Sequence, residues 1–156
     1  MVGVSNVKPH DHVAERRADI LGSGRLSDGT VQSLSVVALA ADACARALAD
    51  CTDTVARSGG LTDEQRLSTL SELWMSKAMK SDRAKAGTPM DAPTLDAYLQ
   101  SARYAYAYLF YTARQPSDRA FELRQVQVIG FYNFAVQRAV ARVFHALPLL
   151  GTEWTQ

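Results

Sequence analysis

Glycine and proline divide the chain into long uninterrupted segments, and this spacing restricts the fold more than any other feature of the sequence. None of the segments alternates apolar and polar residues with a period of two, as a half-buried strand does. The sequence therefore predicts an all-α fold, a helical bundle of four main helices with a short N-terminal arm helix over about Asp11–Leu21. The dividing residues are Gly22 and Gly24, Gly59 and Gly60, Gly87 with Pro89 and Pro93, Pro116, and Pro148 with Gly151.

We expect one domain over residues 1–156, because 47% hydrophobic residues and a net charge of +1 fit a single compact core. Its expected parts are an N-terminal arm (1–26), a helical core (27–147) and a C-terminal tail (148–156). The N-terminus lacks the apolar stretch of a signal peptide, and no uncharged run approaches the roughly 20 residues of a membrane span. These features predict a soluble cytoplasmic protein without a membrane partner.

The second helix is expected to begin at a cap on Ser27 or Asp28 and to end at Arg57. Seven residues apart on one helix, Cys44 and Cys51 would stand two turns from each other, beyond the roughly 5 to 6 Å between Cα atoms in a disulfide. We therefore expect two buried thiols and neither a disulfide nor a redox or metal pair. Apolar residues recur along this helix at coiled-coil spacings of three and four: Leu34, Val37, Ala41, Cys44, Leu48, Cys51 and Val55.

Two further helices follow. Thr62 and Gln65 form the pattern of a capping box, which predicts a helix from this point to a stop at Gly87. The charged stretch near the end of that helix, Lys77–Lys85, is expected to face solvent. The next helix, over about Thr94–Arg114, is apolar nearly all round, which is typical of a helix that is central in the fold or shared with a second chain.

The last helix is expected over about Asp118–Ala146, again with apolar residues at spacings of three and four. Asn133 is the polar member of this series, and it either fixes register and partner choice or bonds a nearby helix end. Two apolar faces on each of two helices exceed what one small core needs, so the sequence predicts self-association as a homo-oligomer or filament. The predicted interface residues are Val126, Ile129, Asn133, Val136 and Val140.

Groups that carry out catalysis or bind metals are few. His10, His12 and Glu15 lack a second ligand pair at helical spacing, and His145 falls at a helix end that favours a cation. Gly22–Arg25 follows a predicted helix and lacks the ending of a phosphate-binding loop. We therefore expect a protein that is not an enzyme, with no catalytic residue, no metal and no cofactor.

The aromatic residues and the positive charge share one half of the chain. All eleven Tyr and Phe residues lie between Tyr98 and Phe144, and residues 94–147 hold six Arg against three acidic residues. Arginine binds phosphates bidentately and aromatic rings stack on unpaired bases, as in a groove for single-stranded RNA. The alternative is a set of salt-bridged arginines on core helices. The predicted RNA-binding residues are Arg103, Tyr104, Arg119 and Arg124.

A family resemblance lies in the same segment, which reads Ala102-Arg103-Tyr104-Ala105-Tyr106, then Tyr108, Thr112, Arg114 and Pro116, then Arg119-Ala120-Phe121-Glu122. This succession resembles the coat proteins of flexuous filamentous plant viruses of the potyvirus type, with a one-residue shift after Pro116. Where the family has the Asp of a pocket beside the RNA, this chain has Ala107. The resemblance implies an all-α core whose terminal arms join neighbouring subunits around single-stranded RNA.

We therefore expect a non-enzymatic, self-associating structural or assembly protein, which packages single-stranded RNA in a virion if the resemblance holds. One alternative is a helical module that binds a small molecule in a pocket bounded by Tyr104, Tyr108 and Tyr132. Another is an adaptor or chaperone that binds a partner helix along the series containing Asn133.

Overall fold

A computed structural model describes residues 20–151, with side chains described as far as His145. This part of the chain contains seven α-helices, one 3₁₀ helix and no strand, so the all-α prediction is confirmed. A bundle of four main helices is not confirmed, because the helix expected over residues 27–57 is three shorter helices. Most of the predicted arm helix, with His10, His12 and Glu15, lies outside the described residues.

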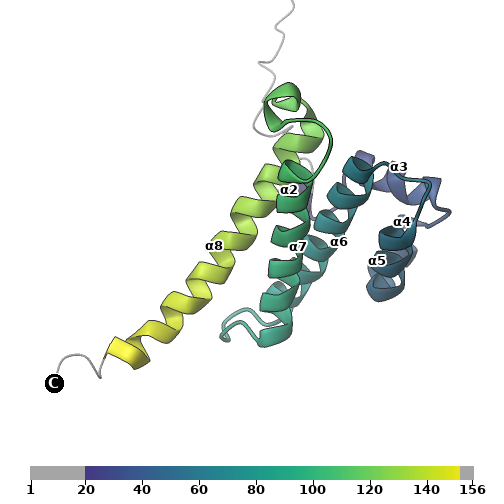
Figure 1. The fold of residues 1–156 in the computed structure, drawn as a ribbon. Helices are drawn as coiled ribbons and strands as arrows, with labels where there is room; N and C mark the ends of the chain where they lie inside the picture. The colour runs from purple at the N-terminus through teal and green to yellow at the C-terminus, as the bar shows by residue number, and fades with distance from the viewer. Residues whose placement is uncertain (1–19, 152–156) are drawn as a thin grey trace, which may run out of the picture.

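Three long helices form the main body of the molecule. They are α6 (Asp63–Ala84), α7 (Ala92–Phe110) and α8 (Leu123–Gly151), and they follow one another side by side (Figure 1). The 3₁₀ helix η1 (Pro116–Arg119) forms the turn between α7 and α8. The helix α8 continues past the predicted end near Ala146, so the first residues of the expected tail are helical.

The short helices lie at the opposite side of α6 from α8 (Figure 1). They are α3 (Asp28–Val36), α4 (Ala41–Arg46) and α5 (Leu48–Arg57). One turn of helix, α2 (Ile20–Ser23), precedes them and places Ile20 in the core beside α6. The residues at the end of the predicted arm are thus part of the folded body.

Local capping explains where the long helices begin. The Thr62 hydroxyl oxygen accepts a hydrogen bond from the Gln65 N–H (3.1 Å), and the Gln65 side-chain oxygen accepts one from the Thr62 N–H (2.9 Å). The predicted capping box is therefore confirmed. The helix α7 begins in the same way, because the Asp91 carboxylate accepts a hydrogen bond from the Thr94 N–H (2.9 Å).

The two cysteines form a disulfide, so the prediction of two free buried thiols was wrong. The chain leaves the helical conformation at Ala47, where φ is −126° and ψ is 66°, and α4 and α5 meet there at a bend. The bend brings the Cα atoms of Cys44 and Cys51 to 5.5 Å and the two sulfur atoms into a bond. The prediction failed because it assumed one straight helix through both residues.

The core has two parts, and α6 contributes to both. Leu70 and Leu73 face the short helices, where they pack with Leu34, Val55 and the disulfide. Met75, Ala78 and Met79 contribute to the other part, between α6, α7 and α8. The partners of these residues in the α7–α8 part of the core are Tyr98, Ala102, Ala105, Tyr108, Leu109, Val128, Phe131 and Ala135.

Candidate interaction surface

The helix α8 has an inner side that packs on α7 and an apolar side that faces solvent. Val128, Phe131 and Ala135 are buried on the inner side. The predicted interface residues lie on the opposite side of α8, where Ile129 is 39% exposed and Val140 is 44% exposed. Val136 and Asn133 are also exposed, and Val126 is half-buried. Their role in an interface stays a prediction, but the structure does leave most of this series uncovered.

A cross-link between three helices fixes which side of α8 faces inward. The Arg138 guanidinium donates hydrogen bonds to both carboxylate oxygens of Asp82 on α6, at 3.0 and 3.1 Å. The Tyr98 hydroxyl on α7 donates to the same carboxylate at 2.7 Å, and burial beside this carboxylate raises the pKa of Tyr98 well above its usual value. Asp82 thus joins all three long helices.

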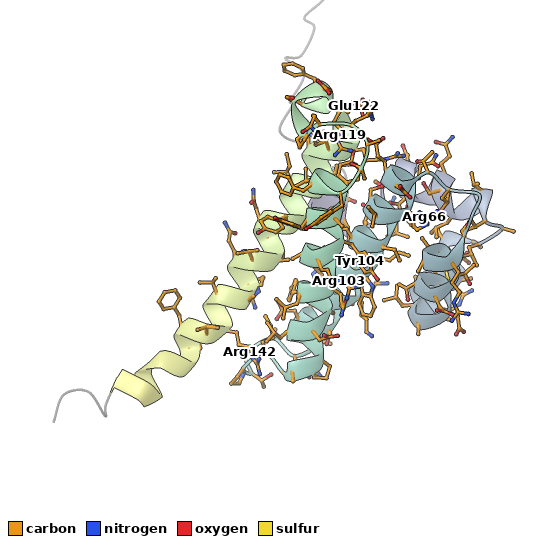
Figure 2. All side chains as sticks on the ribbon, viewed as in Figure 1. Arg66, Arg103, Tyr104, Arg119, Glu122 and Arg142 are labelled. Atoms are coloured by element: carbon orange, nitrogen blue, oxygen red, sulfur yellow. A yellow bond between two sulfur atoms is a disulfide. The ribbon has the colours of Figure 1, made fainter. Side chains whose placement is uncertain are left out.

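The remaining arginines of α8 also point toward the body of the protein. The Arg142 side chain donates to the Met90 carbonyl oxygen (3.0 Å) and lies beside the turn between α6 and α7 (Figure 2). The Arg124 guanidinium lies near Gly29, where an added Cβ would be 3.6 Å from it. Since α8 contains no Asp or Glu, the side opposite these arginines carries no charge between Ile129 and Phe144.

Aromatic residues extend this uncharged surface onto α7. The Tyr106 ring contacts that of Phe110, with 4.7 Å between centroids, and that of Tyr132 on α8 at 6.3 Å. Tyr132 lies one helical turn from both Ile129 and Val136, so the aromatic and aliphatic residues adjoin. We call this surface the outer face; its exposed members are Tyr106, Phe110, Tyr111, Ile129, Asn133, Val136, Val140, Val143 and Phe144.

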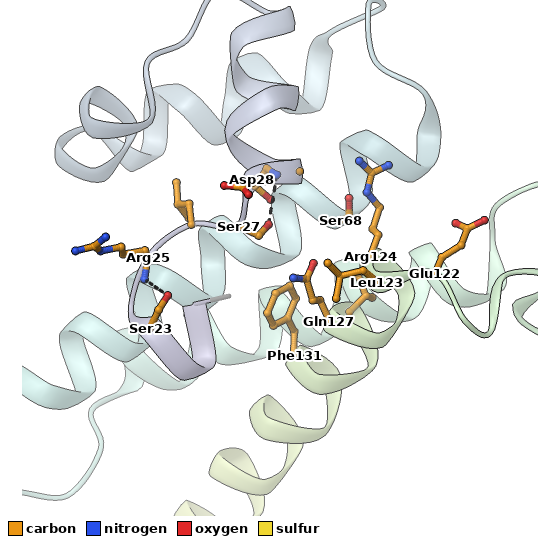
Figure 3. Close-up of a pocket in the computed structure, with 14 residues that line it drawn as sticks. Ser23, Arg25, Ser27, Asp28, Ser68, Glu122, Leu123, Arg124, Gln127 and Phe131 are labelled. Carbon is orange, nitrogen blue, oxygen red and sulfur yellow. Dashed lines mark hydrogen bonds between the residues drawn. The ribbon is translucent and has the colours of Figure 1, made fainter. Parts of the chain in front are cut away.

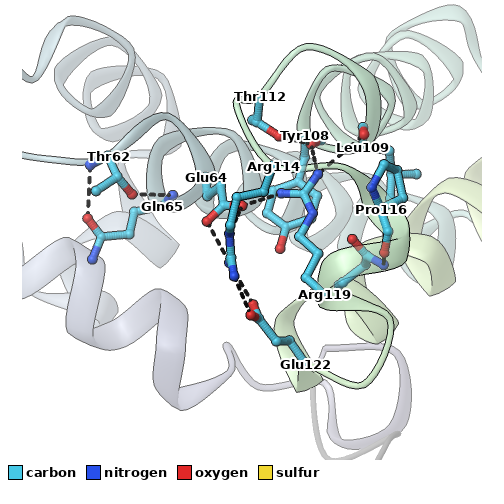
Figure 4. Close-up of polar contacts among 11 residues, drawn as sticks. Thr62, Glu64, Gln65, Tyr108, Leu109, Thr112, Arg114, Pro116, Arg119 and Glu122 are labelled. Atoms are coloured by element: carbon cyan, nitrogen blue, oxygen red, sulfur yellow. Dashed lines mark hydrogen bonds and ion pairs between the residues drawn. The ribbon is translucent and has the colours of Figure 1, made fainter.

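The structure buries one of the predicted RNA-binding residues. Arg119 is only 1% exposed. Its guanidinium donates to the carbonyl oxygens of Tyr108 (2.6 Å) and Leu109 (3.2 Å) and forms an ion pair with Glu64 (Figure 4). Because its guanidinium is enclosed by the protein, Arg119 cannot reach an RNA phosphate in this conformation. For this residue the alternative interpretation, a salt-bridged arginine in the core, is correct.

Arg114 belongs to the same network at the turn between α7 and α8. It donates to Glu64 at 2.9 and 3.0 Å and to Glu122 at 2.5 and 2.8 Å. Hydrogen bonds from Arg114 hold the pKa of both carboxyl groups below their usual range, and Arg119 lowers that of Glu64 further. The network joins the start of α6 to both ends of the turn.

The other predicted RNA-binding residues do not form one site. Arg103 lies over the Tyr104 ring, 5.2 Å from its centroid, midway along α7, whereas Arg119 is at the turn (Figure 2). Arg124 lines a separate cavity between α3 and the start of α8. The structure therefore does not bring Arg103, Arg119 and Arg124 into one groove.

That cavity has a volume of about 540 Å³ and lies beside the start of α3 (Figure 3). Asp28 and Glu122 line it together with Arg25 and Arg124, so its charges are mixed. The buried Glu72 carboxylate already accepts hydrogen bonds from the N–H and hydroxyl of Ser27, the residue that caps α3. The cavity is thus a poor match for an anion, and Tyr104, Tyr108 and Tyr132 do not line it.

Sequence reasoning missed Asp82 as a structural anchor. It lies within the charged stretch Lys77–Lys85, which we expected to face solvent. Its Arg138 partner is 56 positions further along the chain, and no short-range pattern links the two. The periodicity of α8 could have identified this pair only if it had already shown which side of the helix is buried.

The chain matches no known protein-family model, and comparisons with curated proteins and with solved structures return no match. Between residues 20 and 151, no helix is long and apolar enough to cross a membrane. The same part of the chain holds no group of three or more His, Cys, Asp or Glu residues arranged to bind a metal ion.

Proposed function

We propose that the protein is a self-associating structural or assembly protein and that its outer face is the contact between copies. The observation that carries this proposal is that the face is exposed, is apolar apart from Asn133, and along α8 carries no charge, because the arginines of this helix all point inward. Exposed contiguous apolar patches are uncommon on monomeric proteins and typically mark interaction surfaces. From Ile129 to Phe144 the face extends about 22 Å along α8 at 1.5 Å per residue.

Charge favours a second copy of this chain as the occupant. A partner that presented charged residues to this face would have to desolvate them without any opposite charge to receive them, which is costly. A second copy presents the same uncharged, apolar and aromatic residues. Two such faces related by a two-fold axis form an isologous interface, the commonest arrangement in soluble oligomers.

The structure gives RNA packaging less support than self-association. Arg119 is enclosed by protein, and Arg114 is engaged by two carboxylates. What remains for the RNA hypothesis is the exposed Arg103 beside Tyr104 and, in a separate cavity, Arg124, together with the family resemblance. We therefore restrict the proposed function to self-association.

Size-exclusion chromatography with light scattering tests this function over a range of protein concentrations. We expect the wild type to form a dimer or larger oligomer, and Val136→Glu and Val140→Glu to elute as monomers. Gln32→Glu places the same new charge on the exposed side of α3, away from the outer face, and should leave the oligomer intact. Circular dichroism shows whether each variant is folded. A wild type that remains monomeric at high micromolar concentration would overturn the proposal.

A further inference from the structure

The bend between α4 and α5 has no cause in the local sequence. No Gly or Pro occurs between Gly29 and Gly59. The residue at the bend, Ala47, is of the type with the highest helix propensity. Its neighbours Ala45, Arg46, Leu48 and Ala49 are also good helix formers. A chain of this composition favours one continuous helix, so a constraint other than propensity must hold the bend.

The backbone hydrogen bonds are consistent with an interrupted helix. The Ala47 N–H donates to the Ala43 carbonyl oxygen (3.0 Å), and the Cys51 N–H donates to the Ala47 carbonyl oxygen (3.3 Å). Between these two bonds the regular ladder is broken, because Ala47 belongs to neither helix. In a continuous helix the Leu48 N–H would bond to the Cys44 carbonyl oxygen, and the following residues would continue the series.

The disulfide supplies the missing constraint. In a straight helix the Cα atoms of Cys44 and Cys51 would be about 10.5 Å apart along the axis, at 1.5 Å per residue. A disulfide needs less than about 7 Å, and the bend reduces the distance to 5.5 Å. The disulfide and the straight helix therefore exclude each other.

We propose that the Cys44–Cys51 pair is a redox switch whose reduction by cellular thiols joins α4 and α5 into one continuous helix. A thiolate attacks one sulfur atom and breaks the sulfur–sulfur bond, which leaves a mixed disulfide and one cysteine thiolate. A second thiolate releases the other cysteine and forms the oxidised disulfide of the reductant. Two electrons pass to the protein, and each cysteine takes up one proton from solvent.

The straight helix would present one continuous apolar face. Cys44, Leu48, Cys51 and Val55 follow one another at spacings of four, three and four, so they would share one face directed at α6. Leu48 is only half-buried in the bent form and would gain cover. The helices α4 and α5 lie at the edge of the molecule remote from α8 (Figure 1), so this change leaves the outer face as it is.

The disulfide is buried, so a reducing thiol can reach it only after a local opening of the fold. Cys44 is fully buried and Cys51 is 4% exposed, but Ala45, Arg46 and Ala47 beside them are exposed. A thiol thus reaches the sulfur atoms through local opening of the short helix α4. Disulfides persist in oxidising compartments and are reduced in a typical cytosol. We therefore expect the bent form in an oxidising compartment and the straight form in the cytosol.

Hydrogen exchange measured by mass spectrometry tests the switch on the full chain. The oxidised protein is compared with protein reduced by dithiothreitol, and the number of free thiols is counted by alkylation and intact mass. In the reduced protein we expect the amides of Leu48, Ala49 and Asp50 to exchange at least tenfold more slowly. Exchange at these amides that is unchanged or faster on reduction would overturn the proposal.

Two variants separate straightening from a general change in stability. Cys44→Ser combined with Cys51→Ser cannot form the bond, so it should show the slow exchange without reductant. Leu48→Pro suits the first position of α5 but cannot continue a helix from α4, so it should abolish the slowing in reduced protein. The amides of α6 and α7 report whether each variant is folded. Slow exchange that persists in reduced Leu48→Pro would contradict a continuous helix.

Discussion

The Arg119 guanidinium lies over the ring of Tyr108, 4.2 Å from its centroid, and donates a hydrogen bond to the carbonyl oxygen of the same residue. This contact closes the C-terminal end of α7, where backbone carbonyl groups have no partner within the helix. A buried arginine thus caps one helix and pairs with Glu64 at the start of another. The turn between α7 and α8 is held by this residue rather than by apolar packing alone.

Replacing Arg119 should therefore destabilise the fold strongly. We expect Arg119→Ala to lower the free energy of unfolding by about 3 kcal/mol, because carbonyl oxygens and part of a carboxylate lose a buried donor. Arg119→Lys keeps the charge but has no planar fork, so it should recover only part of the loss. Urea denaturation measures both. A loss below about 1 kcal/mol in the alanine variant would show that the buried contacts contribute little.

The network around Arg114 predicts a loss of stability in acid. The pKa of Glu64 and that of Glu122 are lower in the folded protein than the ordinary value of 4.5. The folded state thus binds these protons less readily than the unfolded chain, and the stabilisation is fully present above pH 4.5. It is lost as the pH falls below 4.5 and through the lower pKa values of the folded protein.

Arg114→Gln isolates this contribution. The variant should be less stable than the wild type at pH 6.5, and the difference should shrink toward pH 3, because the two carboxyl groups of the unfolded chain, with pKa values near 4.5, are protonated there. Denaturant unfolding at the two pH values measures the difference. Arg103→Gln removes a charge outside the network and should show no comparable pH dependence. A difference between Arg114→Gln and the wild type that is the same at both pH values would contradict the role given to Arg114.

Some features of the fold follow from local sequence, and the start of α6 is the clearest. Thr62 and Gln65 are three residues apart, and their reciprocal hydrogen bonds depend on nothing distant. The bend at Ala47 is different, because its cause is a covalent bond between residues that a straight helix would keep apart. The propensity of residues 41–57 indicates a helix throughout, and only the structure shows the bend that lets the two sulfur atoms meet.

The capping box itself gives a prediction. Thr62→Ala removes the acceptor of the Gln65 N–H and should lower the free energy of unfolding by about 1 kcal/mol. Thr62→Ser retains a hydroxyl oxygen at the same place and should stay close to the wild type. Thermal or urea unfolding followed by circular dichroism distinguishes the two. Equal stability of Thr62→Ala and Thr62→Ser would mean that water replaces the cap without cost.

The site shows a second limit of sequence reasoning. The spacing along α8 identifies an apolar series through Ile129, Asn133 and Val136 but does not say whether it faces the core or solvent, because the opposite side is apolar too. Arg138 shows which side of α8 faces the core, because its carboxylate partner Asp82 is on another helix. For Arg119, the sequence left an RNA contact and a core salt bridge open, and only tertiary packing distinguishes them.

A Phe→Ala substitution should have different effects on the two sides of α8. Phe131 is 2% exposed on the inner side, so Phe131→Ala should cost about 3 to 4 kcal/mol of stability through lost burial and a cavity. Phe144 is 64% exposed, so Phe144→Ala should change monomer stability by no more than about 0.5 kcal/mol. On the proposed function, the same variant should weaken self-association. Urea denaturation measures the first effect and light scattering across a dilution series measures the second. Because Phe144 contributes little to the monomer core, a Phe144→Ala oligomer as tight as the wild type would remove this end of α8 from the interface.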